Sequence, residues 1–534
     1  MTVTIFSSVV LIVGLAAFLR IFRIFERGLI FWDDGERVLQ TQYLVDLIRF
    51  IGKHASLSLF KNDSLAKAHS SFRGVPPFDC NPLNILIYAG IALVGVSVKH
   101  SAIIANAVFG TIGIIGVYAT AALMFDPQVA VLSTLLLTIS GQHLLYSRSV
   151  HAEVTCGAFY IWATYVCYLS YITGSLTLVV VTGLLVGLAF VCNSRHVYIP
   201  MFFLIYQATI GWHGSAEMMV LRFLLLGTGM AFPLVVLTFA VGALRELGYP
   251  GPSYPRQLVS LLLAGKGSWS LRLPYLSIFL RSFWELEGIV PLVGFAGCGI
   301  LVAEGSFRTM ILVSQVLVPL LFWSARGVPR TAENQVVEGF AHSMPRFMSS
   351  SIYALIITAA VAATTLPSFW SDLLVGVIVL MGLYRATWIV KMRSGFQAAI
   401  VYMGSHGGLG HMSFCPPISR VYAETVDVGN PFPLGDAEFI EQCRQRKFQY
   451  LLYVPSIHRN TFFSRPLNGV LERLLASETP EFTVPLGMIP FRAVYWDEHN
   501  NPDSNIMREN VIAIYDLQKY LSAHDGPVSL AVSG

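Results

Sequence analysis

The sequence predicts a polytopic α-helical membrane protein with about 11 transmembrane helices, further juxtamembrane helices and a C-terminal soluble α/β domain. Hydrophobic residues make up 54% of the 534 residues and charged residues only 12%, against about 25% charged in an ordinary soluble domain. Residues 154–194 contain no Asp, Glu, Lys or Arg, and residues 101–147 contain only Asp126. Each block is long enough for two crossings of ~20 residues. The 140 residues after residue 394, by contrast, hold 24 charged side chains and no apolar run of membrane length.

Twelve apolar windows follow one another before residue 394. The first lacks a basic leader and a cleavage site and runs into Arg20 and Arg23, so we expect an uncleaved helix. The windows cover residues 3–25, 80–98, 101–125, 127–147, 153–173, 175–193, 197–212, 219–243, 286–304, 308–324, 350–366 and 372–391. We expect a transmembrane domain over residues 1–394, with a first outer loop at 26–79, and a soluble domain over residues 395–534.

The tail has the pattern of a small α/β domain. An amphipathic run beginning at Asp436, which we expect to be the N-cap, predicts a helix, and alternation over residues 449–455 predicts a strand. A second helix is expected over residues 466–476 and a second strand over residues 491–496.

The topology depends on the window at residues 80–98, which either spans the bilayer or lies in the interface. If it lies in the interface, eleven crossings remain and all the polar clusters, with the tail, share one face. If it spans, the first loop lies opposite the others. We favour eleven crossings because buried polar groups are costly and concentrate at functional sites.

Composition also excludes some classes of function. A net charge of +4 over this length, without a basic run, argues against nucleic acid as a partner. The seven cysteines form no CxxC pair and no zinc-type spacing with histidine, so we expect them to act as small apolar residues.

The first loop opens with an acidic group formed by Asp33, Asp34 and Glu36. A partly desolvated carboxylate at the membrane interface has a raised pKa and can act as a general base on a hydroxyl. Acidic residues after a helix are also often no more than solvated loop residues.

Polar side chains, among them several arginines and histidines, gather at the ends of three crossings on the same expected face. These residues are Tyr146, Arg148, His151 and Glu153 at the first boundary, Arg195 and His196 at the second, and His342 and Arg346 at the third. Any one arginine could simply extend to the lipid headgroups. Together they predict a cationic rim suited to the phosphate of a membrane lipid.

In this order the motifs resemble the GT-C superfamily of polyprenyl-phosphate-sugar-dependent glycosyltransferases, in the branch of protein O-mannosyltransferases and lipid A aminoarabinose transferases. The motifs are the acidic pair Asp33-Asp34, a proline-led helix start at Pro76-Pro77 or Asn81-Pro82-Leu83, the boundary with Tyr146, Arg148 and Glu153, and Pro345-Arg346-Phe347 before a later crossing. The family's usual Asp-Glu pair is here Asp-Asp, and Asn81 stands nearest to its usual histidine before proline.

The resemblance implies inverting transfer of a sugar from a polyprenyl-phosphate donor to a lipid, glycan or protein acceptor outside the cytoplasm, in a bacterial or archaeal cell (inner) membrane. Asp33, with Asp34 beside it, is expected to act as the base, and Arg148, Arg195, His196 and Arg346 to bind the donor phosphate. Glu36, Tyr146, His151, Glu153 and Asp79 are expected to support them. Oxygen ligands in the acidic group allow a divalent metal, but this branch does not generally require one, and we expect no cofactor.

A transporter or flippase for a lipid-linked or small anionic substrate is the alternative, because its composition would be similar. Windows 101–125, 153–173 and 175–193 carry no charge in their interiors, however, and the polar groups gather at the window ends. We therefore favour the enzyme.

Overall fold

The computed structural model describes residues 2–30, 32–54, 82–212, 215–246, 273–325, 345–408, 410–423, 428–431, 434–455, 467–485 and 511–524. The chain divides into two compact units. The membrane unit consists of Met1–Phe25 and Arg37–Val390, and the C-terminal unit of Glu26–Glu36 and Lys391–Gly534. The short acidic segment Glu26–Glu36 therefore groups with the tail and not with the helices on either side of it.

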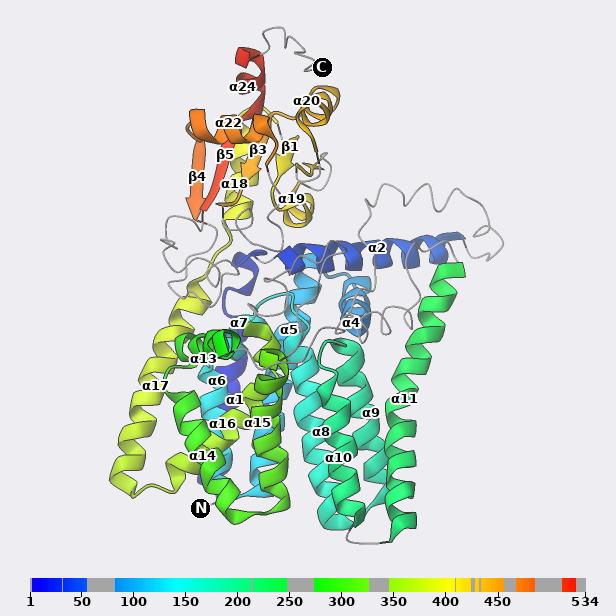
Figure 1. Ribbon diagram of the computed structural model, residues 1–534, viewed down its shortest axis with the longest axis vertical. Coiled ribbons are helices and arrows are strands. Elements are labelled where there is room, and N and C mark those ends of the chain that lie inside the picture. Colours follow the sequence, from blue (N-terminus) through cyan, green and yellow to red (C-terminus); the bar gives the residue numbers. More distant parts are fainter. Residues whose placement is uncertain are drawn as a thin grey trace. The chain divides into compact units, whose positions relative to one another are not determined.

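The membrane unit is a helical bundle (Figure 1). Its helices are α1 (Thr2–Ile21), α4 (Pro82–Leu93), α5 (Val98–Met124), α6 (Pro127–Ile139), α7 (Gly141–Ser147), α8 (Glu153–Thr173), α9 (Leu176–Cys192), α10 (Tyr198–Trp212), α11 (Ala216–Glu246), α13 (Leu273–Glu287), α14 (Val290–Glu304), α15 (Phe307–Ala325), α16 (Ser351–Thr364) and α17 (Ser368–Lys391). Helix α2 (Trp32–His54) begins in the acidic segment and enters this unit at Arg37. The expected first outer loop thus contains a long helix.

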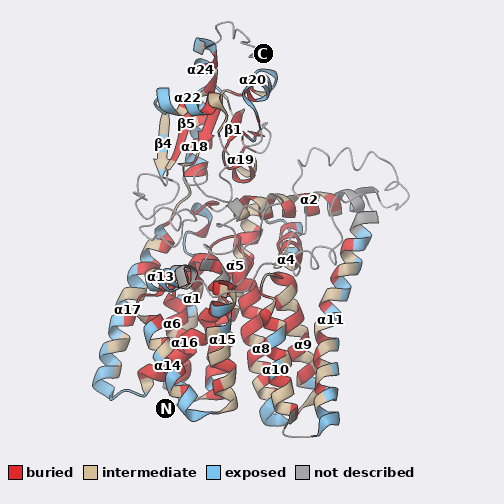
Figure 2. Ribbon diagram, viewed as in Figure 1, coloured by how far each residue is buried: buried red, intermediate tan, exposed pale blue. Residues whose placement is uncertain are grey.

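Several helices have the length and hydropathy of membrane spans. Within the described residues, five qualify singly, and up to seven qualify if the bent pairs α6–α7 and α13–α14 each count as one span. Large apolar side chains face outward on α11, where Phe239 is 76% exposed, as a lipid-facing surface requires (Figure 2). The polytopic helical class is confirmed. The total of about 11 crossings stays a prediction, because α9, α10 and α16 are shorter apolar helices.

Local sequence signals set the helix ends away from the polar boundaries. The Asp126 carboxylate accepts hydrogen bonds from the backbone N–H groups of Gln128 and Val129 at 2.8 and 2.9 Å, and Pro127 occupies the first helical position of α6. Helix α8 ends at Gly174, whose φ of 69° favours glycine. These signals account for the short connections between α5 and α6 and between α8 and α9.

Helix α4 bears on the topology of window 80–98. It has 12 residues, and at 1.5 Å per residue it is ~18 Å long, shorter than the ~30 Å hydrocarbon core. This length supports the interfacial alternative for the window. The proline motif before α4, with Pro76, Pro77 and Asn81, lies outside the described residues.

The C-terminal unit is built on a five-stranded mixed sheet with the order β2-β1-β3-β5-β4. Strand β1 (His411–Ser413) pairs in parallel with β2 (Val428–Gly429) and β3 (Tyr450–Tyr453), while β5 (Val511–Asp516) is antiparallel to β3 and β4 (Phe482–Pro485). Its helices are α18 (Gly395–Ser405), α19 (Pro416–Tyr422), α20 (Asp436–Gln445), α22 (Gly469–Ser477) and α24 (Leu517–His524). The predicted α/β class of the tail is confirmed.

In the tail, the N-cap of one helix differs from the prediction, while a second helix and one strand lie where they were expected. The N-cap of α20 is Gly435, and the Asp436 carboxylate instead accepts a hydrogen bond from the Val470 N–H at the start of α22. The expected helix at 466–476 is α22, capped by Asn468, and the strand at 449–455 is β3. The strand expected at 491–496 lies outside the described residues.

Candidate active site

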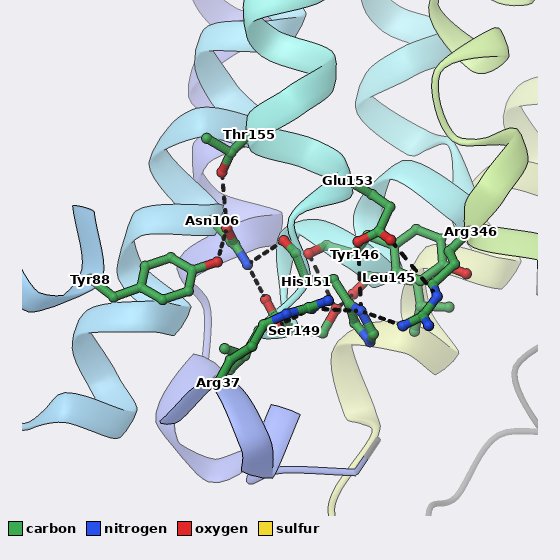
Figure 3. Close-up of polar contacts among 11 residues, drawn as sticks. Arg37, Tyr88, Asn106, Leu145, Tyr146, Ser149, His151, Glu153, Thr155 and Arg346 are labelled. Carbon is green, nitrogen blue, oxygen red and sulfur yellow. Dashed lines mark hydrogen bonds and ion pairs between the residues drawn. The ribbon is translucent and has the colours of Figure 1, made fainter. Parts of the chain in front are cut away.

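A buried polar cluster lies where the turn before α8 meets the turn before α16 (Figure 3). Arg346 Nη1 is 3.3 Å from His151 Nδ1, and Arg346 Nε is 3.8 Å from Glu153 Oε1. The second Glu153 oxygen is 3.6 Å from His151 Nδ1. All three side chains are at most 3% exposed. The structure therefore brings together three residues that lie on two different boundaries of the sequence.

A second guanidinium, that of Arg37, completes this cluster from α2. Arg37 Nη1 donates to the Val150 carbonyl at 2.7 Å and approaches His151 Nδ1 at 3.1 Å. A guanidinium has no acceptor atom, so a hydrogen bond between it and the imidazole requires Nδ1 to be the acceptor. The anion-site cluster, defined as Arg37, His151, Glu153 and Arg346, thus carries two guanidinium charges and one carboxylate.

An amide holds the backbone beneath this cluster. Asn106, in the middle of α5, donates from Nδ2 to the carbonyls of Ser149 and His151, the latter at 2.9 Å. Its Oδ1 accepts from the hydroxyls of Tyr88 at 3.0 Å and Thr155 at 3.1 Å (Figure 3). The Asn106 Nδ2 therefore fixes the 149–151 turn, which presets the position of the His151 ring, while Tyr88 and Thr155 hold the amide through its Oδ1.

Tyr146 packs on the same imidazole. Its ring is edge-on to His151, with 5.5 Å between centroids and an interplanar angle of 76°. The supporting position expected for Tyr146 beside His151 and Glu153 is thus one of packing.

His196 lies in the turn between α9 and α10. Its Nδ1 hydrogen bonds with the Tyr198 hydroxyl, which is 2.7 Å from the Ser350 hydroxyl in the turn after Arg346. Burial lowers the pKa of His196 to about 3, and the charges of Arg195 and Arg346 add to the fall. Arg195 itself is half-buried. His196 is consequently neutral at physiological pH and contributes a hydrogen-bonding group, not a charge.

Acid should destabilise the protein partly through His196. The unfolded chain binds a proton near pH 6.5, whereas the folded ring does so only near pH 3, so stability is lost as the pH falls below 6.5. At pH 5 this one group should cost about 2 kcal/mol. We expect His196→Gln to flatten the fall in thermal unfolding temperature between pH 7 and 5. An identical fall in the variant would contradict a buried neutral His196.

Arg148 occupies a different place. Its Nη1 donates to the carbonyls of Leu19, Arg20 and Phe22 at 2.7, 3.1 and 3.0 Å, and its side chain is fully buried. These are the carbonyls that the end of α1 leaves without helical partners. The contacts give Arg148 a structural role as the cap of α1, and the expected contact with phosphate stays a prediction.

The acidic residues of the first loop lie in the C-terminal unit, at the start of α2. Asp33 is half-buried, as is Glu36, and Asp34 is 1% exposed and accepts a hydrogen bond from the Ile30 N–H at 3.2 Å. Burial lowers the pKa of Arg27 to about 10, and the nearby charge of Asp34 limits the fall. Asp34 is therefore engaged inside the unit, while its neighbour Asp33 keeps part of its surface accessible.

Asp79 and His342 lie outside the described residues. Within the described parts of the chain no group of three or more His, Cys, Asp or Glu residues is arranged to hold a metal ion.

Sequence reasoning missed Arg37 and Asn106. Arg37 follows the acidic motif directly and lies four positions after Asp33, about one helical turn away. Asn106 is a lone amide in an apolar run, which is costly unless the amide is satisfied. Both signals were present in the sequence.

Comparison with known proteins agrees with this architecture. Residues 81–239 match the family model of dolichyl-phosphate-mannose-protein mannosyltransferases. The crystal structure of the apo oligosaccharyltransferase of Archaeoglobus fulgidus is similar over 86% of this chain and 70% of its own, with 12% identity and a TM-score of 0.51. The same archaeal enzyme in complex with an inhibitory peptide and a dolichol-phosphate gives 11% identity over the same shares, with a TM-score of 0.50.

The crystal structure of ArnT from Cupriavidus metallidurans, bound to undecaprenyl phosphate, is also similar. It has 13% identity over 78% of this chain and 74% of its own, with a TM-score of 0.47. Comparison with curated protein sequences gives no match. The resemblance to GT-C glycosyltransferases and the fold class predicted from the motifs are confirmed.

Proposed function

We propose that this protein is an integral membrane glycosyltransferase that moves a sugar from a polyprenyl-phosphate donor to an acceptor outside the cytoplasm. The observation that carries the proposal is the convergence of the Arg37 and Arg346 guanidiniums on the His151 imidazole at an end of the bundle. Arginine is the side chain best suited to hold a phosphate, because its planar fork donates two parallel hydrogen bonds. The dolichol-phosphate named in the archaeal structure is a ligand of that chemistry.

The reaction needs a proton acceptor and a stabilised leaving group. In the proposed step the acceptor hydroxyl gives its proton to the Asp33 carboxylate while its oxygen bonds to the anomeric carbon of the sugar. The bond from that carbon to the phosphate oxygen breaks, and the guanidinium of Arg346 stabilises the charge left on the phosphate, with Arg37, Arg195 and Arg148 contributing. Attack opposite the leaving group inverts the anomeric centre.

The half-buried state of Asp33 supports its role as the base. The base must reach a substrate proton, and Asp34 is buried and bonded to the Ile30 N–H. Both lie in the first turn of α2, where the helix dipole stabilises the negative charge that a base must carry.

We further propose a bacterial or archaeal cell (inner) membrane as the location, with the site and the 395–534 domain outside the cytoplasm. Residues 1–394 would form the catalytic domain. The acceptor would be a lipid, a glycan or a protein, and catalysis would need neither a metal nor another cofactor.

A transfer assay tests the proposal against the transporter alternative. The full-length protein in liposomes should release polyprenyl phosphate from radiolabelled polyprenyl-phosphate mannose and carry the label to one of a panel of hydroxyl acceptors. If polyprenyl-phosphate mannose is not cleaved, the assay is repeated with other polyprenyl-phosphate sugars as donors. Movement of intact labelled donor across the bilayer without cleavage would instead favour a flippase.

A further inference from the structure

The acidic segment is held by the C-terminal unit through its backbone. The Ser394 N–H donates to the Arg27 carbonyl at 2.6 Å, and the Ser394 hydroxyl donates to the Leu29 carbonyl. The Leu29 N–H in turn donates to the Tyr422 hydroxyl oxygen at 2.8 Å. Three hydrogen bonds therefore tie residues 27–29 to the end of α19 and the start of α18.

Two glycines bring this segment into close contact with α19. A Cβ at Gly28, whose φ is 71°, would lie 2.5 Å from the Tyr422 hydroxyl and 2.9 Å from the Ser394 Cβ. A Cβ at Gly35 would lie 2.5 Å from the Ile418 nitrogen. Since Gly28 and Gly35 flank the acidic pair, the segment is fixed on both sides of Asp33 and Asp34.

The electrostatics of the same unit agree with this placement. Burial raises the pKa of the Cys415 thiol at the start of α19, and the charges of Glu36 and Asp34 contribute to the rise. Asp34 and Glu36 therefore lie close to the first turn of α19. Burial also raises the pKa of Tyr422 to about 12, so its hydroxyl stays neutral at any physiological pH.

We propose that Tyr422 and Ser394 are positioning residues, which hold the 27–35 backbone so that Asp33 is presented in one orientation to the acceptor. The inference rests on the proposed function. A base that is displaced by about 1 Å can lose up to ~10²-fold in rate. The hydrogen bonds of Ser394 and Tyr422 with the backbone of residues 27–29 therefore affect turnover. The C-terminal unit would then be part of the catalytic machinery and not an independent appendage.

Tyr422→Phe tests the tether, because it keeps the ring and removes the acceptor for the Leu29 N–H. We expect kcat for sugar transfer from polyprenyl-phosphate mannose to fall about 10-fold, with the donor KM within 2-fold, since a single hydrogen bond is worth roughly that factor. Hydrogen exchange of the 26–36 backbone should accelerate. The matched control is Tyr450→Phe, whose hydroxyl donates to the His406 carbonyl at 2.7 Å elsewhere in the unit.

Gly28→Ala tests the same contact from the other side and serves if Tyr422→Phe does not fold. Its control is Gly174→Ala, which has a similar φ of 69° but open space around the added methyl group. Gly28→Ala should lower kcat and accelerate exchange in the 26–36 segment, and Gly174→Ala should do neither. Wild-type kcat in Tyr422→Phe and Gly28→Ala, or equal losses in their controls, would overturn the inference.

The exchange measurement separates this inference from the proposed function. If the wild-type protein cleaves no polyprenyl-phosphate sugar, the proposed function fails. If the wild type is active and exchange in the 26–36 segment is the same in Tyr422→Phe as in the wild type, the tether fails alone.

Discussion

Asp33→Asn is expected to lower the rate of sugar transfer by about 10²–10⁴-fold, the usual worth of a general base. The amide has nearly the same size as the carboxylate but cannot accept the acceptor's proton. Binding of the polyprenyl-phosphate donor should be unchanged, because it depends on guanidinium groups and not on Asp33. Single-turnover transfer and equilibrium binding of a fluorescent polyprenyl phosphate measure the two quantities separately.

The matched control lies in the same segment. Glu26 is an acidic residue whose carboxylate pairs with Arg393 at 3.1 Å on the surface, with 47% of the side chain exposed. A surface ion pair of this kind contributes little, so Glu26→Gln should leave transfer unchanged. If Asp33→Asn retains transfer, the base must be sought at Asp34 or Asp79. If both variants lose activity together, the segment is sensitive to any loss of charge and Asp33 has no special role.

Much of the fold could be predicted because bilayer-length apolar runs have few alternative structures. The helices α5 and α8 follow from uncharged runs alone, and the helix and strand at α20 and β3 follow from local periodicity. The break between α6 and α7 could not be predicted in this way. Here Ser140 caps α7 and also donates to the Glu287 carboxylate, a contact over 147 residues that no local pattern records.

The sequence indicated which residues could form the candidate site, but not which partner each side chain contacts. Tyr146, His151, Glu153 and Arg346 were all identified from their boundaries, and they do meet in the bundle. Arg148 shows the opposite case, because a guanidinium at a helix end is equally suited to a phosphate and to the free carbonyls of a neighbouring helix. The choice depends on where α1 ends in space. The association of the acidic segment with the tail, almost 400 residues later, likewise rests on long-range contacts.

Arg346 should be the most important residue for the donor phosphate. We expect Arg346→Gln to lower kcat/KM for the donor by about 10²–10³-fold, as loss of a preorganised charge-stabilising donor does elsewhere. Arg346→Lys should recover part of this, because it restores the charge without the planar fork. Arg281, which is exposed and pairs with Glu285 on α13, provides a control substitution, Arg281→Gln, without effect.

The structural role of Arg346 must be separated from the chemical one, because its removal leaves the Glu153 carboxylate buried without its guanidinium partner. The double variant Arg346→Gln, Glu153→Gln removes both charges and should regain much of the thermal stability lost in the single variant. If Arg346 binds the phosphate, transfer stays low in this stable double variant. If transfer returns with stability, Arg346 serves only to neutralise Glu153, and the phosphate must be held by other cations.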